Sequence, residues 1–183
     1  TQLKELRLYN NQLTGPVVLG CSKNIYQDLK LALTMVDLSF NQLTRFNLSS
    51  AADAEVCLNP TSLSRLHLSE NRLKGPLPNG IGSFTGLLEL GVSHNQYSSV
   101  LPKSIGSLVK LQVLDLSDNN FDPVLPSSLC SLQFFDMTLC NFTSGYDATI
   151  KPDGWDCSSL GCECAEEIYT ACKVSVTLVV CSL

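Results

Sequence analysis

The side chains able to do chemistry in this 183-residue chain are few, and they form no known catalytic pattern. Three carboxylates, Glu70, Asp115 and Asp118, could act as paired acids, which requires a pocket that raises the pKa of one of them. The two histidines, His67 and His94, could bind a metal ion or respond to pH, but no third ligand is evident. The sequence also lacks the GxSxG and HExxH motifs and the phosphate-binding P-loop. We therefore expect no enzyme activity, no metal ion and no cofactor.

The cysteines and two glycosylation sequons indicate an oxidising compartment. Of nine cysteines, seven lie after residue 129: Cys130, Cys140, Cys157, Cys162, Cys164, Cys172 and Cys181. Cys162 and Cys164 form one close pair, but no second pair or nearby histidine completes a zinc site. Sequons begin at Asn47 and Asn141. Together these features favour a location outside the cell or on the extracellular face of a membrane.

Composition and charge exclude several classes of partner. An apolar fraction of 44% and a charged fraction of 16% fit a packed core. The net charge is −5 and no basic run occurs, so neither nucleic acid nor an anionic membrane surface is expected as a partner. No stretch approaches the roughly 20 apolar residues that span a bilayer. The most apolar tract, 174–180, predicts a terminal strand or cap segment, with a clipped anchor signal as the alternative.

The elements that would position these side chains are copies of one repeated unit. Five asparagines mark it, at spacings of 30, 30, 24 and 24 residues: Asn11, Asn41, Asn71, Asn95 and Asn119. Each follows an apolar comb such as Leu63, Leu66 and Leu68. Further columns recur every 24 residues, as in Pro78, Pro102 and Pro126. A degenerate sixth copy would place Phe134, Met137 and Leu139 at the comb positions.

Each column has a physical role in such a coil. Leu66 and Leu68 alternate as in a strand, so both point inward, and successive copies would stack as parallel strands. An asparagine carries a donor and an acceptor, so a buried one can satisfy backbone groups of its own coil and the adjacent coil. An apolar residue there would leave those groups unpaired, at about 1–3 kcal/mol each. Pairs such as Leu77-Pro78 fix an extended outer segment.

These columns resemble the plant-type leucine-rich repeat, LxxLxLxxNxLxGxIPxxLGxLxx. The stretch LSRLHLSENRLKGPLPNGIGSFTG is close to a consensus copy, and the match covers residues 1–133. The resemblance implies an α/β-type, right-handed solenoid with a parallel β-sheet on its concave face and short 3-10 or irregular segments on its convex face. Such repeats occur mostly in ectodomains of receptor-like kinases, in receptor-like proteins and in secreted enzyme inhibitors. Similar repeats with a Cys-rich ending occur in algal and other stramenopile proteins.

The chain departs from that pattern at three places. The 30-residue spacings add about six residues near 17–32 and 48–62, where Cys21 and Cys57 could bridge adjacent coils. The turn glycine becomes Arg45, Ser99 or Pro123 in three copies, which argues against a second strand there. The tryptophan-bearing N-terminal cap of the family is absent. Residues 134–183 are expected to form a degenerate last repeat and a disulfide-stabilised cap, whose pairing the sequence leaves open.

The concave face is the expected ligand surface, because strand residues between the leucines point outward. The candidate ligand-binding residues are Arg7, Tyr9, Asp37, Phe40, Arg65, His67, Glu89, His94, Asp115 and Asp118. Tyr, Phe and Arg are favoured anchors at interfaces. The acids on such an open sheet would be solvated, which argues against acid–base catalysis.

Three functions fit this surface. The first is a recognition ectodomain that binds a protein or peptide; the chain begins inside an apolar comb, which predicts further repeats upstream in a parent protein that can be membrane-anchored. The second is an inhibitor of a secreted hydrolase, with Asp37, Asp115 and Asp118 facing a basic partner. The third is a structural or surface-binding role toward carbohydrate or ice through a serine column: Ser39, Ser69, Ser93 and Ser117.

Overall fold

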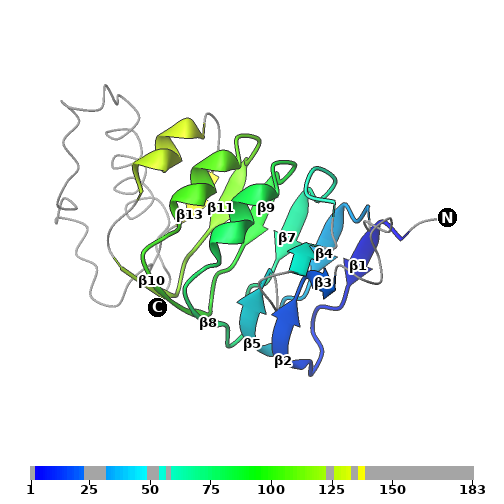
Figure 1. Cartoon of the computed structure of the whole chain (residues 1–183). Coiled ribbons are helices and arrows are strands. Elements are labelled where there is room, and N and C mark those ends of the chain that lie inside the picture. Colours follow the sequence, from blue (N-terminus) through cyan, green and yellow to red (C-terminus); the bar gives the residue numbers. More distant parts are fainter. Residues whose placement is uncertain are drawn as a thin grey trace.

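The computed structural model shows a stack of coils with a long parallel sheet on one side and short 3-10 helices on the other (Figure 1). It describes residues 3–22, 32–48, 54–56, 59–122, 126–132 and 136–138. A coil runs from a strand of the main sheet through an asparagine turn to a second short strand, and then returns over the outer side.

Six parallel strands form the main sheet, in the order β1 (Glu5–Arg7), β4 (Met35–Asp37), β7 (Arg65–His67), β9 (Glu89–Gly91), β11 (Val113–Asp115) and β13 (Asp136–Thr138). Their middle residues are in register, in the order Leu6, Val36, Leu66, Leu90, Leu114 and Met137. The middle residues of β4, β7, β9 and β11 are fully buried. The predicted parallel sheet is therefore confirmed, and β13 places Met137 where the degenerate sixth copy predicts it.

In the part of the chain that the structure describes, three 3-10 helices cover the opposite side: η1 (Asn79–Ser83), η2 (Lys103–Ser107) and η3 (Ser127–Ser131). Each begins directly after a proline of the repeated column, and the proline carbonyl accepts the first helical hydrogen bond, as from Ile81 N–H to Pro78 O at 3.0 Å. Ile81 and Phe84 enter the core from this side and are fully buried. The prediction of short 3-10 segments on the convex face is confirmed.

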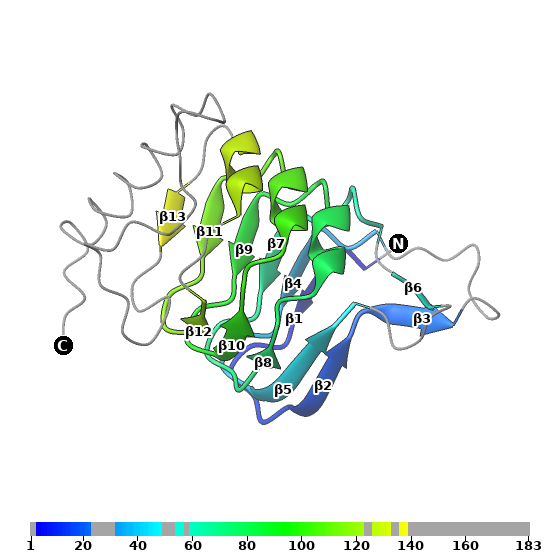
Figure 2. The same ribbon diagram turned by 60° about the vertical axis from the view of Figure 1, so that its left-hand side comes forward.

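A second row of short strands follows the asparagine turns (Figure 2). β2 (Thr14–Val18) pairs with β5 (Gln42–Asn47), and β8 (Lys74–Gly75), β10 (Gln96–Ser99) and β12 (Asn120–Phe121) form a separate three-stranded sheet. The expectation that copies without the turn glycine lack this strand is wrong. Ser99 itself adopts a φ of 68°, and Arg45 lies opposite Pro16 beside an irregularity in the β2–β5 register. Backbone bonds such as Gln96 N–H to Leu73 O form without the glycine. Pro123 lies outside the described residues.

The two inserted segments contribute an antiparallel pair, β3 (Gly20–Ser22) and β6 (Ala54–Val56). Cys21 lies in β3, but Cys57 lies outside the described residues, so a bridge between them stays a prediction. Among the seven expected cap cysteines, Cys130 falls in η3 and the others lie outside the described part. Asn141, the apolar tract 174–180 and the rest of the expected cap also lie outside it.

Tyr97 carries a buried hydroxyl that has no hydrogen-bond partner among the described residues. Its ring stacks on Phe121 with centroids 5.8 Å apart, and burial raises the pKa of Tyr97. Because an unpaired buried polar group is costly, Tyr97→Phe is expected to raise the free energy of unfolding by about 1 kcal/mol in urea denaturation. A loss of stability of that size would contradict this expectation, because it would mean that the hydroxyl has a partner.

Candidate binding face

The asparagine after each strand ties two coils together and so fixes the register of the face. The side-chain amide of Asn71 donates to Leu68 O at 3.0 Å and Ser69 O at 3.1 Å in its own coil. It also donates to Leu38 O of the preceding coil at 3.0 Å, and its Oδ1 accepts the N–H of Leu43 at 3.0 Å. One buried side chain thereby satisfies four backbone groups on two coils.

The same arrangement recurs along the stack. Four-bond patterns are made by Asn41, Asn95 and Asn119. At the N-terminal end, the exposed Asn11 donates only to Leu8 O and Tyr9 O among the described residues. The strands that carry the candidate side chains are therefore held by bonds between coils as well as by the sheet.

The residue before each asparagine has a left-handed backbone conformation and lies on the concave side. The φ angles are 54°, 55°, 55°, 50° and 49° for Asn10, Phe40, Glu70, His94 and Asp118. Asn and Asp tolerate this region, whereas a bulky side chain does so at a cost. Phe40 is nevertheless 57% exposed. Burial of its ring therefore does not offset the free-energy cost of its strained backbone within the described fold.

Charged candidates form two clusters on neighbouring strands. Glu89 on β9 joins Arg65 Nε at 3.0 Å and His67 Nε2 at 3.2 Å, both on β7. Farther along the strands, His94 Nε2 lies 3.3 Å from Asp118 Oδ2 and 3.8 Å from Glu70 Oε1. Within these clusters the carboxylates contact histidine or arginine rather than one another. The side chains are 30–51% exposed, which leaves them solvated and reachable by a ligand.

Two acidic candidates contact their own turns. Asp37 Oδ1 accepts the N–H of Ser39 at 3.0 Å, and Asp115 Oδ1 accepts both the N–H and the hydroxyl of Ser117. The strands between them carry His67 and Gly91 at the same position. The continuous acidic column needed by the hydrolase-inhibitor hypothesis is therefore interrupted at its centre.

The serine column is mostly hidden rather than displayed. Ser39, Ser93 and Ser117 are only 8%, 4% and 7% exposed. The hydroxyl of Ser93 donates to that of Ser69 at 3.0 Å. Ice or carbohydrate could not lie flat on hydroxyls buried to this extent, so the geometry disfavours surface binding through this column.

The N-terminal end of the face displays aromatic side chains. Tyr9 and Phe40 are 53% and 57% exposed and lie on adjacent coils, one position apart along the repeat. Arg7, next to Tyr9, pairs with Glu5 at 2.7 Å. Val113, at the other end, is 41% exposed. Within the described ranges, no group of three or more His, Cys, Asp or Glu side chains could hold a metal ion. The described side chains of this face offer contact area and charge.

Two parts of the sequence match family models. Residues 61–121 match one described as "Leucine rich repeat", and residues 2–24 match a second described as "Leucine Rich Repeat". The chain is a leucine-rich-repeat protein. The matched models describe a repeat and not an enzyme, and no curated protein matches this leucine-rich-repeat chain.

Solved plant receptor structures resemble this leucine-rich-repeat protein. The Arabidopsis receptor kinase HAESA, solved with the peptide hormone IDA and the co-receptor SERK1, is 29% identical, with a TM-score of 0.59 over 74% of this chain. Pollen Receptor Kinase 3 is 26% identical, with a TM-score of 0.58 over 82% of this chain and 68% of its own. The ectodomain of SOBIR1 from Arabidopsis thaliana is 27% identical, with a TM-score of 0.53 over 75% of this chain and 70% of its own. The present chain spans only 21% of HAESA.

Two further observations concern this leucine-rich-repeat protein as a whole. In the described ranges, no helix is both long and apolar enough to cross a bilayer.

Sequence reasoning missed the flank formed by the second row of strands, where Arg45 and Lys74 line one groove. The available signals were Pro76, which cannot continue a strand ladder, and the extra residues in the second copy.

Proposed function

We propose that this chain is an extracellular recognition module whose concave face binds a protein or peptide, and that it catalyses no reaction. Phe40 carries the proposal, because it combines a strained backbone with a large exposed ring. The turn imposes a positive φ at this position in every described copy, but it does not require an aromatic ring there, and a strained residue that the fold does not need is an observation from which a functional role can be inferred. Asn10, at the same position of the first copy, shows that a polar residue tolerant of this conformation fits the position.

The surroundings of Phe40 support a protein or peptide as ligand. Tyr9 supplies a second ring beside it, and Arg65 and His67 supply cationic or polar groups on the next strand. Aromatic and arginine side chains dominate the binding energy at protein interfaces. The resemblance to HAESA, whose structure contains a peptide hormone and a co-receptor, agrees with this class of ligand. The similarity to SOBIR1, whose solved structure is that of an ectodomain, supports an extracellular location. We also propose glycans on Asn47 and Asn141 and a cap stabilised by disulfides.

Phe40→Asn tests the proposal because it should separate stability from binding. Relief of the left-handed strain is expected to raise the free energy of unfolding by about 1 kcal/mol. Random dodecapeptides displayed on phage are selected on the chain, and one class of the selected peptides is expected to bind this variant at least about tenfold more weakly. Urea denaturation and biolayer interferometry measure the two effects.

Val109→Asn is the matched control, since Val109 is 58% exposed and follows η2 on the convex side. It should leave peptide binding unchanged. If every selected peptide bound Phe40→Asn as tightly as the unmodified chain, the concave face would not be the ligand surface.

A further inference from the structure

The second row of strands is interrupted between β5 and β8. β5 is hydrogen-bonded to β2, while β8 belongs to the other sheet with β10 and β12. The two coils are joined just before β8 begins: the Arg72 N–H donates to Leu43 O at 2.9 Å, and the Leu43 N–H donates to Asn71 Oδ1. Beyond Leu43, the described part of the chain provides no strand partner for this edge of β5.

The interruption follows from the sequences of the two copies. β8 contains only Lys74 and Gly75, because Pro76 has no N–H to continue a ladder. β5 continues to Asn47 and belongs to a copy with inserted residues. A long strand therefore lies beside a short one, and the edge from Thr44 to Asn47 is left open over about 13 Å.

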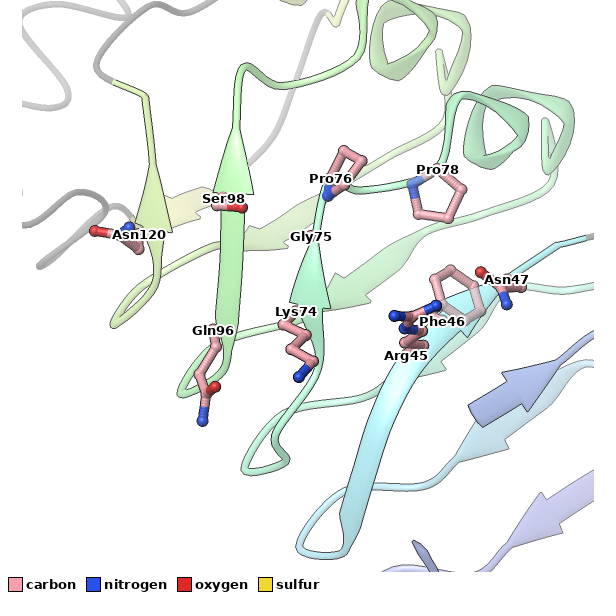
Figure 3. Close-up of a pocket in the computed structure, with 10 residues that line it drawn as sticks. All are labelled: Arg45, Phe46, Asn47, Lys74, Gly75, Pro76, Pro78, Gln96, Ser98 and Asn120. Carbon is pink, nitrogen blue, oxygen red and sulfur yellow. The ribbon is translucent and has the colours of Figure 1, made fainter. Parts of the chain in front are cut away.

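An open groove of about 730 Å³ lies along this interruption (Figure 3). The exposed cations Arg45 on β5 and Lys74 on β8 both line it, and Pro76 and Pro78 supply apolar surface. None of the ten lining residues is acidic, although the whole chain carries a net charge of −5. Among the described residues, neither Arg45 nor Lys74 forms an ion pair.

We propose that this groove, when Asn47 carries no glycan, binds an extended acidic peptide segment of a partner protein, which adds as a strand to the open edge of β5. Backbone groups of an unpaired edge can bond to an extended peptide, and alternate side chains then determine specificity. A carboxylate on the peptide would contact Arg45 and Lys74, and its apolar neighbours would pack against Pro76 and Pro78. This site lies on the second row of strands, so it is separate from the concave face that carries Phe40.

The test selects random dodecapeptides displayed on phage against the full chain carrying Asn47→Gln, because Asn47 lines the groove and this substitution removes the sequon without adding an acid. The double variant Arg45→Glu/Lys74→Glu is the target for counter-selection. We expect a class of peptides rich in Asp and Glu that binds the double variant at least about tenfold more weakly. The same peptides should keep their affinity for Phe40→Asn and for Lys110→Glu, an exposed cation elsewhere.

Further controls separate strand addition from simple charge attraction. Arg45→Gln/Lys74→Gln should weaken the same peptides, and thermal melting should show that all variants fold. Proline is substituted at each position of the tightest-binding peptide in turn. Substitution at every second position should abolish binding, because the N–H groups of those residues donate to β5. The proposal is overturned if no acidic peptide depends on Arg45 and Lys74, or if proline is tolerated everywhere. It is equally overturned if sedimentation shows that a second copy of the chain occupies this edge.

Discussion

Asn71→Ala is expected to lower the free energy of unfolding by about 3–5 kcal/mol. The substitution removes four hydrogen bonds and leaves the Leu43 N–H and the carbonyls of Leu38, Leu68 and Ser69 without their side-chain partner. Each buried group left unpaired costs about 1–3 kcal/mol, although water can reach some of them in the variant. Urea denaturation followed by circular dichroism measures the loss.

Asn11→Ala is the matched control, because Asn11 occupies the same column on the exposed first coil. It bonds only to the carbonyls of Leu8 and Tyr9 among the described residues. Its loss should cost less than about 1 kcal/mol. Equal losses at the two positions would show that the asparagines act within their own turns and do not join the coils.

Gly82→Ala is expected to lower the free energy of unfolding by about 3 kcal/mol, because it separates two outer helices that touch. A Cβ built on Gly82 of η1 would lie 2.3 Å from the carbonyl oxygen of Ser104 on η2. That oxygen belongs to the backbone and cannot rotate away. Ser104 is itself fixed, because its hydroxyl donates to Asn79 O at 2.6 Å. The coils would have to move apart, which loosens the leucine core between them.

Gly80→Ala, in the same helix, serves as the control for changes in backbone entropy. The added methyl would meet only the side chain of Leu48, at 3.0 Å from its Cδ1, which can shift. We expect a change within about 0.5 kcal/mol. Thermal and urea unfolding of both variants check the pair, and similar stabilities for Gly82→Ala and Gly80→Ala would rule out tight stacking of η1 on η2.

The period of the sequence was sufficient to predict the main sheet and its register. Alternating leucines such as Leu66 and Leu68 identify strand and core at once, because a two-residue period places both on one face. The Leu-Pro column predicted an extended outer segment, and Pro78 and its equivalents are extended directly before each 3-10 helix. These features depend on local residue types that recur in every copy, so five copies supply the same information several times.

The clusters of the face were less predictable, because they depend on side-chain rotamers across strands. His67 and His94 were both expected on the concave face, but each contacts a different acid, Glu89 and Asp118 respectively. The left-handed conformation of Phe40 left a signal in its column, because Asn10 and Asp118 are residue types that tolerate positive φ. Recognising that signal would have singled out Phe40 as the one aromatic residue of the column.

The interruption beside β5 could not be read from any single copy. It arises where a copy with an inserted segment meets the first 24-residue copy, and where Pro76 ends the shorter strand. The repeat consensus describes each coil alone, whereas the groove depends on the mismatch between two. Arg45 consequently looked like a departure from the consensus glycine rather than a residue that lines a groove.

The binding face exists only if neighbouring coils are joined in the register that the asparagines set. The most direct measurement is hydrogen exchange of asparagine side-chain amides in D₂O, followed by nuclear magnetic resonance on the unmodified chain. The amides of Asn41, Asn71, Asn95 and Asn119 should exchange about 100-fold more slowly than those of the exposed Asn11 and Asn79. Equal exchange rates for the two groups would contradict the joined coils and, with them, the concave surface built on the strands.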